Sequence, residues 1–163
     1  MSLAGGLIAR HGARIVCLEH DNDLPIPLIT AARAAGGEVL IVGDAVAHLP
    51  GALAGLPIER IADPEERLRR VSALAQAFVG LPGSLASTGD LYRCWVRAGS
   101  GASGKPVVLL NRNRAFEVLR GLSADILSHS VKRHDRLTVF TDNIDDLWNR
   151  ISWALSEAGP TAA

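Results

Sequence analysis

The residues of this chain best suited to chemistry follow a short apolar run that ends at Pro82-Gly83. Small hydroxylated residues come next, Ser84, Ser87 and Thr88, and a helical pattern begins among them. A strand that turns into a helix start collects free backbone N–H groups and the positive end of the helix dipole, which suits an anion such as phosphate. The alternative is that Ser87 or Thr88 only caps its own helix.

A second polar group lies in the loop Glu19-His20-Asp21-Asn22-Asp23, which packs three carboxylates and an imidazole into five residues. The loop follows a β-branched apolar strand, and the carboxyl ends of strands form the edge where open α/β sheets bind ligands. One interpretation is a hydroxyl-binding or metal-binding site, with Glu19, His20 and Asp21 as loop contacts. The other is a set of solvated loop charges, which is the commoner case.

Composition excludes several classes of protein. The 163 residues are 48% hydrophobic, and Lys+Arg equals Asp+Glu at 17 each, so neither a nucleic acid nor a membrane surface is predicted as a partner. Cys17 and Cys94 are far apart and resemble small core residues in a reducing compartment, so no metal site follows from them. The chain shows neither a secretion signal nor an apolar run of membrane-spanning length. We therefore expect a cytoplasmic protein.

The elements that must position these residues alternate between strands and helices. Short apolar runs bounded by turn signals predict strands near residues 13–18, 38–43, 77–81, 106–110 and 137–140, with a further short strand near 58–61. Segments of helix length separate most of them, which predicts an open, mostly parallel sheet with helices on both faces. We expect one domain over residues 1–158 and a disordered tail over 159–163.

The run from Arg67 to Asn111 resembles the Lonely Guy (LOG) family, once labelled possible lysine decarboxylases. The residues that match the family's motifs in type and spacing are Arg67, Ala77-Phe78, Pro82-Gly83, Leu91 and Lys105-Pro106-Val107. The resemblance implies a Rossmann-like fold, a homodimer and hydrolysis of nucleoside 5′-monophosphates to free base. Asp90 and Arg67 would be the catalytic residues, and residues 82–88 would bind the phosphate. The family also has a strand ahead of the first helix, and we expect that strand to be missing from this sequence.

The sequence departs from the family at the phosphate loops. Ser84 and Ala86 stand at two motif glycines, where a Cβ hinders approach of the backbone to a phosphate. Other family residues are also replaced: the threonine by Ser87, the glutamate by Asp90 and the lysine by Leu68, while Trp95 stands about two positions early. The second glycine-rich loop of the family falls at residues 18–26, where the carboxylates of the Glu19 loop would repel a phosphate.

Three hypotheses follow. The favoured one is a divergent LOG-like protein that binds a nucleotide or another small ligand through degenerate phosphate loops, with little or no catalysis. The second is an active nucleoside monophosphate phosphoribohydrolase, in which a carboxylate stabilises the positive charge that develops on the ribose. The third is a cofactor carrier or dimeric scaffold. None of the three requires a cofactor or a metal of the protein's own.

Overall fold

The computed structural model describes residues 1–20, 23–99, 104–129 and 138–159. It is an α/β protein in which strands and helices alternate, and every ladder between the named strands is parallel. By its internal contacts the chain divides into two compact units, Met1–Ala75 and Gln76–Ala163, each with its own three-stranded sheet. The predicted α/β class and open parallel sheet are confirmed, whereas the single domain over residues 1–158 stays a prediction.

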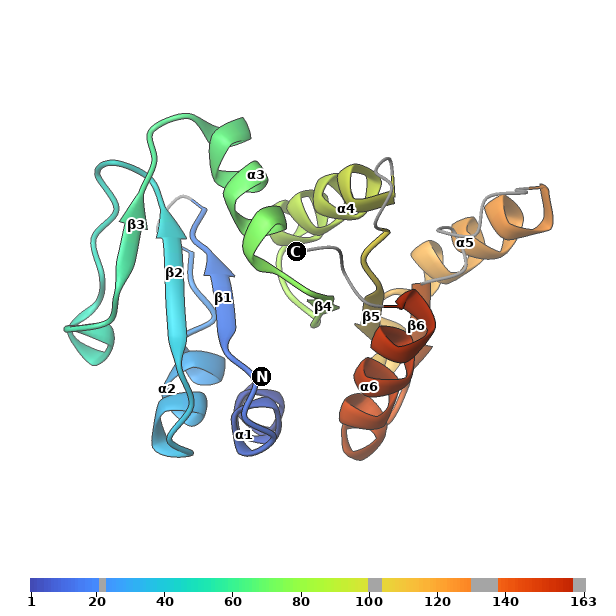
Figure 1. The fold of residues 1–163 in the computed structure, drawn as a ribbon, viewed down its shortest axis with the longest axis horizontal. Coiled ribbons are helices and arrows are strands. Elements are labelled where there is room, and N and C mark those ends of the chain that lie inside the picture. Colours follow the sequence, from blue (N-terminus) through green and yellow to red (C-terminus); the bar gives the residue numbers. More distant parts are fainter. Residues whose placement is uncertain (21–22, 100–103, 130–137, 160–163) are drawn as a thin grey trace. The chain divides into compact units, whose positions relative to one another are not determined.

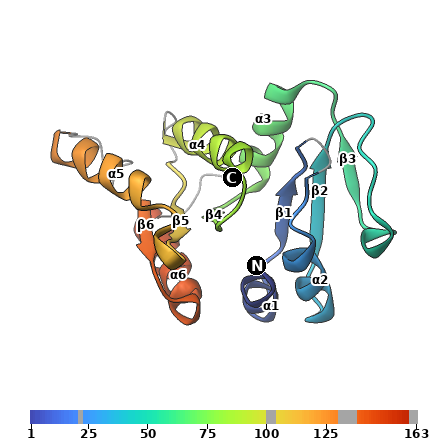
Figure 2. The same ribbon diagram turned by 180° about the vertical axis from the view of Figure 1, so that it is seen from behind.

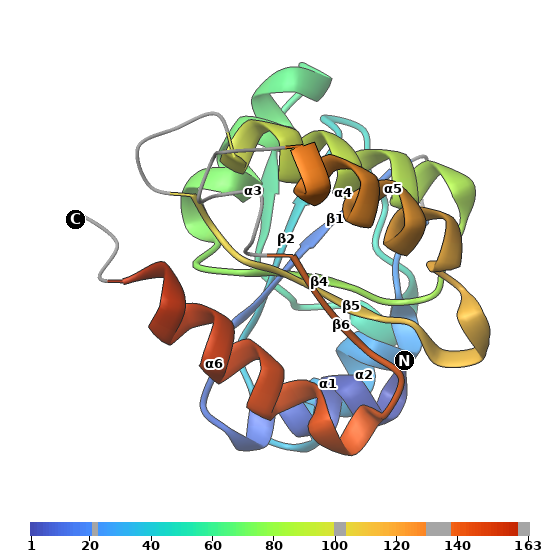
Figure 3. The same ribbon diagram turned by 90° about the vertical axis from the view of Figure 1, so that its right-hand side faces the viewer.

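The first unit contains a sheet in the order β1-β2-β3 (Figure 1 and Figure 2). Helices α1 and α2 pack against each other on one side of it, and α3 lies against β1 and β2 on the other (Figure 3). Its elements are α1 Ser2–Arg10, β1 Ile15–Leu18, α2 Ile26–Ala34, β2 Val39–Gly43, η1 Gly51–Leu53, β3 Ile58–Arg60 and α3 Pro64–Leu74.

The second unit contains a sheet in the order β4-β5-β6. Helices α4 and α5 cover one face of it and α6 covers the other (Figure 3). Its elements are β4 Phe78–Gly80, α4 Leu85–Gly99, β5 Val107–Leu110, η2 Arg112–Arg114, α5 Glu117–His129, β6 Thr138–Thr141, η4 Ile144–Asp146 and α6 Leu147–Ala158.

The central strand of each sheet forms the middle of the core. All four residues of β5 are buried, and Ile41 and Val42 of β2 are fully buried. A strand with neighbours on both edges and helices on its faces must be apolar on both faces, which is why these segments are uninterrupted apolar runs. Side chains that follow such a strand therefore start from a fixed backbone position at the carboxyl edge of the sheet.

The predicted strands are confirmed to within two residues at each end, including the short one near 58–61. Two helices of the second unit follow a 3-10 turn: α5 begins at Glu117 after the turn over Arg112–Arg114, and α6 begins at Leu147 after the turn over Ile144–Asp146. Local capping explains the second turn, because the Asn143 side chain accepts a hydrogen bond from Asp145 N.

Two remaining expectations concern the end of the chain and membranes. Gly159 ends α6 with a φ of 77°, a conformation that glycine adopts without strain. Residues 160–163 of the predicted tail lie outside the described residues. Within the described part of the chain, no helix combines the length and apolarity needed to span a bilayer.

Candidate functional site

The carboxyl edge of the first sheet begins with Glu19, which directly follows β1. Its backbone N donates to Val42 O at 2.9 Å, and its Oε2 accepts from Asp44 N at 2.9 Å. Glycine at position 43 leaves room for the carboxylate, because a Cβ there would lie only 3.1 Å from Glu19 Oε2. Glu19 is only 3% exposed, so it ties the ends of β1 and β2 together rather than standing as a solvated loop charge.

Two other residues of the acidic loop, His20 and Asp23, pair with each other. His20 and Asp23 make an isolated antiparallel bridge, in which Asp23 N donates to His20 O at 2.8 Å. Asp21, the third predicted loop contact, lies outside the described residues. No group of three or more His, Cys, Asp or Glu side chains able to hold a metal ion occurs among the residues that the structure describes.

Arg67 projects from α3 to the same edge of the first sheet. The helix begins at an Asp63 cap, whose Oδ1 accepts from Glu66 N at 2.7 Å. Arg67 Nη1 donates to Asp44 Oδ2 at 2.6 Å, and it also approaches two backbone carbonyls, Ile61 O at 2.9 Å and Ala62 O at 3.3 Å. The Arg67 residue is 9% exposed. Its guanidinium is therefore engaged inside the first unit.

Asp44 connects Glu19 to Arg67, and the three residues are called the Glu19–Asp44–Arg67 cluster below. Hydrogen bonds hold the pKa of the Asp44 carboxyl below its usual value, first from the backbone N–H of Val46 and then from the Arg67 guanidinium. Sequence reasoning did not find Asp44. The sequence signal for Asp44 was its position directly after β2, at the same edge of the sheet where the Glu19 loop begins.

In the second unit, the polar residues of the predicted phosphate loop hydrogen-bond to one another. Ser84 is the capping residue of α4, because its Oγ accepts from Ser87 N at 3.1 Å. The hydroxyls of Ser87 and Thr88 donate back to Ser84 O at 2.9 and 3.0 Å. The predicted capping role thus falls to Ser84 rather than to Ser87 or Thr88. Pro82 and Gly83 precede this cap, and a Cβ on Gly83 would lie 2.8 Å from Ser87 Oγ.

Asp90 lies in the second turn of α4 and is 8% exposed. Its Oδ1 pairs with Arg93 Nη1 at 3.3 Å, an i, i+3 pair on the same helix. Arg67 belongs to the first unit and Asp90 to the second. That the two side chains act together as catalytic residues therefore stays a prediction.

The loop at the carboxyl end of β5 is a third polar feature, and sequence reasoning did not identify it as a site. Asn111 is 2% exposed: its Oδ1 accepts from Phe116 N at 2.7 Å, and its Nδ2 donates to Glu117 at 3.0 Å and to Asp142 at 3.2 Å. The loop that it closes carries Arg112 and Arg114, both exposed. The sequence signal for this feature was an asparagine directly after an apolar strand, with two arginines in the next three residues.

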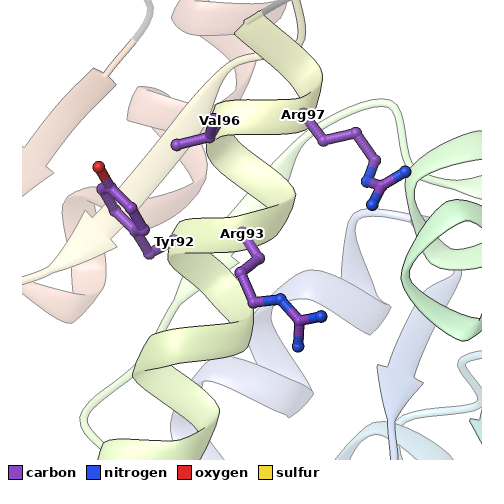
Figure 4. A pocket seen from close by; sticks show the side chains of 4 residues that line it. All are labelled: Tyr92, Arg93, Val96 and Arg97. Atoms are coloured by element: carbon purple, nitrogen blue, oxygen red, sulfur yellow. The ribbon is translucent and has the colours of Figure 1, made fainter. Parts of the chain in front are cut away.

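The outer surface of α4 has an open hollow of about 400 Å³ lined by Tyr92, Arg93, Val96 and Arg97. Tyr92 and Val96 lie on one side of the helix, and Arg93 and Arg97 on the other (Figure 4). The Tyr92 ring meets the Trp95 ring edge to face, with centroids 5.8 Å apart. Ligand sites are enclosed and bring a few polar groups together from several elements, so this hollow has the character of a contact surface.

No protein-family model matches the chain, and a search of curated proteins also finds no match. The structure supports an α/β fold with parallel sheets, and membership of the LOG family remains a resemblance in the residues named above.

Proposed function

We propose that this protein is a divergent, LOG-like cytoplasmic protein that binds a nucleotide or another small ligand at the carboxyl edges of its parallel strands and catalyses little or no hydrolysis. The observation that carries the proposal is the engagement of Arg67 by Asp44 at 2.6 Å. In an active phosphoribohydrolase this arginine would have to be available to the phosphate or the ribose. A phosphate that approaches Arg67 here must displace a carboxylate that already satisfies it.

The second unit supports the same conclusion. The hydroxyls of Ser84, Ser87 and Thr88 could each donate to a phosphate in place of a glycine N–H, but all three make hydrogen bonds within the helix start. Each missing phosphate donor weakens binding by about 1 kcal/mol or more. The proposed carboxylate of catalysis, Asp90, is buried and paired with Arg93. These arrangements suit a stable fold better than turnover.

The direct test is to incubate the protein with AMP and the other nucleoside monophosphates and to quantify free base by chromatography. We expect base release no faster than in buffer, and the same result for the Asp90→Asn variant. Release that is fast in the wild type and abolished in Asp90→Asn would establish the hydrolase instead.

A binding experiment tests the role given to Arg67. In the Asp44→Ala variant the Arg67 guanidinium has no carboxylate partner at position 44, so we expect tighter AMP binding than in the wild type by calorimetry. Asp146→Ala is the matched control, because it removes the carboxylate of an aspartate–arginine pair in the second unit, Asp146–Arg150, and leaves Asp44 and Arg67 unchanged. Equal AMP affinity in Asp44→Ala and the wild type would refute the account of Arg67 as a blocked anion ligand.

A second candidate function, a dimeric scaffold, is favoured by the outer surface of α4. Leu85 is 91% exposed, and Tyr92 and Val96, at 41% and 53%, continue the apolar stripe at helical spacing. A homodimer is also what the resemblance implies. Light scattering of the wild type and of Val96→Glu tests it: a dimer that dissociates in the variant supports the scaffold, and a monomeric wild type rejects it.

A further inference from the structure

We propose that Arg112 and Arg114 form a binding site for an oxyanion, a phosphate or carboxylate group of a small ligand, at the carboxyl end of β5. The proposal deepens the proposed function and rests on it, since both place the ligand at a carboxyl edge of the parallel strands. It differs from the phosphate loop expected from sequence, because neither arginine belongs to residues 82–88.

The position of the loop is the first argument. β5 is the central strand of its sheet, with β4 on one side and β6 on the other. Gly80 pairs with Leu109, and Leu110 pairs with Thr141, so the chain leaves all three strands at this edge. Ligands of open α/β sheets bind outside the carboxyl ends of the strands. The loop after β5 is one of the three loops that such a ligand could contact at this edge.

The rigidity of the loop is the second argument. Asn111 N donates to Thr141 O at 2.7 Å, and Arg114 N donates back to Asn111 O at 3.0 Å. With the three side-chain bonds of Asn111, these contacts fix the backbone from which both arginines project. Loops that are fixed in advance bind ligands with a smaller loss of conformational entropy.

Backbone strain in the same loop is the third argument. Asn113 and Arg114 both have positive φ, 56° and 60°, and they are the only non-glycine residues with positive φ in the described part of the chain. This conformation is unfavourable by roughly 1–2 kcal/mol for an ordinary side chain such as that of arginine. Strain of this kind persists where the surrounding structure enforces it, and it is concentrated at ligand-binding sites.

The charges around the loop leave both guanidiniums available. The nearby carboxylates are engaged by other donors: Glu117 by Asn111, and Asp142 by Asn111 and by Arg120 at 3.2 Å. Among the residues that the structure describes, Arg112 and Arg114 make no ion pair, whereas Arg120 is held by Asp142 and by the face of Phe140. Within the described residues, therefore, no ion pair neutralises the positive charge of Arg112 and Arg114.

The two arginines can reach one anion together. They are two positions apart in the sequence, so their Cα atoms lie at most about 7 Å apart even in an extended chain. Each guanidinium presents a planar set of N–H donors that matches the oxygens of phosphate and carboxylate. An oxyanion bound by both arginines would be the negatively charged partner that no carboxylate among the described residues provides.

NMR titration tests the proposal. Inorganic phosphate, acetate and chloride are added separately at constant ionic strength, and the amide shifts of residues 111–116 are followed. We expect saturable shifts with phosphate or acetate but not with chloride, and the stronger of the two identifies the ligand group. The Arg112→Ala/Arg114→Ala double variant should bind that anion roughly tenfold more weakly.

The matched control is Arg10→Ala/Arg33→Ala, which removes two exposed arginines and the same total charge from α1 and α2 of the first unit. It should bind the anion as the wild type does. Equal weakening in both double variants, or equal shifts with chloride, would show general electrostatics and overturn the site. Release of base from AMP would overturn the proposed function without affecting this result, so the two failures are distinguishable.

Discussion

Replacing Gly5 by alanine sets two opposing effects against each other within one helix. Gly5 lies in the interior of α1, where alanine is favoured over glycine by about 1 kcal/mol. A Cβ at this position would stand 2.1 Å from Leu28 O and 2.9 Å from Leu28 C, both backbone atoms of α2. Since real Cβ atoms essentially never approach closer than 3.0 Å, α1 and α2 must separate by about 1 Å.

The steric term should exceed the helix propensity. Forcing extra methyl groups into a packed interior destabilises proteins by about 1–3 kcal/mol, and a clash with backbone belongs at the upper end because no side-chain rotation relieves it. We therefore expect Gly5→Ala to lower the free energy of unfolding by about 1–2 kcal/mol after the favourable change in propensity is included. Urea unfolding followed by far-UV circular dichroism measures this difference.

Gly6 provides the control in the same helix. A Cβ there would lie 3.2 Å from Arg10 Nη1, the end of a flexible side chain, and 4.0 Å from Ala31 O. Gly6→Ala should therefore keep most of the favourable propensity and be more stable than the wild type by about 0.5–1 kcal/mol. A Gly5→Ala variant at least as stable as Gly6→Ala would show that α1 and α2 do not pack as closely as described.

Three further predictions concern pH, capping and thiol reactivity. The pKa of Asp44 is lowered in the folded state, first by the Val46 N–H and then by Arg67, so its ionised form stabilises the fold above pH about 4 and this contribution is lost as the pH falls through the lower folded value. Urea midpoints measured between pH 6 and 2 should fall less steeply for Arg67→Met than for the wild type; identical profiles would contradict the pairing. Ser84→Ala should lower the free energy of unfolding by about 1 kcal/mol through loss of the α4 cap, as thermal melts can show, and an unchanged melting temperature would rule out the cap. Burial raises the pKa of the Cys17 thiol to about 12, so mass spectrometry should find it unmodified by iodoacetamide at neutral pH until the protein is unfolded, and rapid labelling of the folded protein would refute its burial.

The amino-acid pattern was sufficient for the strands and for the fold class. Segments such as Val107–Leu110 are apolar on both faces and bounded by turn residues, and such a run is typical of a strand covered on both sides. The start of α3 at Asp63-Pro64 follows a rule of the same kind, because a side-chain acceptor followed by proline specifies a helix start through local geometry alone. Such features depend only on residues that are close in sequence.

Hydrogen-bond and ion-pair partners that are distant in sequence could be identified only from the fold. Glu19 and Asp44 are 25 residues apart, and Asp44 and Arg67 are 23 apart, yet parallel strands bring them to one edge. Sequence alone offered Glu19 as a ligand contact or a solvated charge. It could not show that the Glu19 carboxylate is buried and accepts a hydrogen bond from Asp44 N. The type of a charged residue does not determine its partner, because any carboxylate brought within reach can satisfy an arginine.

The same distinction applies to the loop after β5. Its sequence, Asn111 to Arg114, shows two arginines and two asparagines but not which asparagine is buried or which backbone is strained. Asn111 became the anchor because Asp142, 31 residues away, and Glu117 both reach its amide. Local sequence thus determined where each strand ends, while the parallel pairing of strands decided which polar side chains at those ends find partners within the protein and which stay exposed.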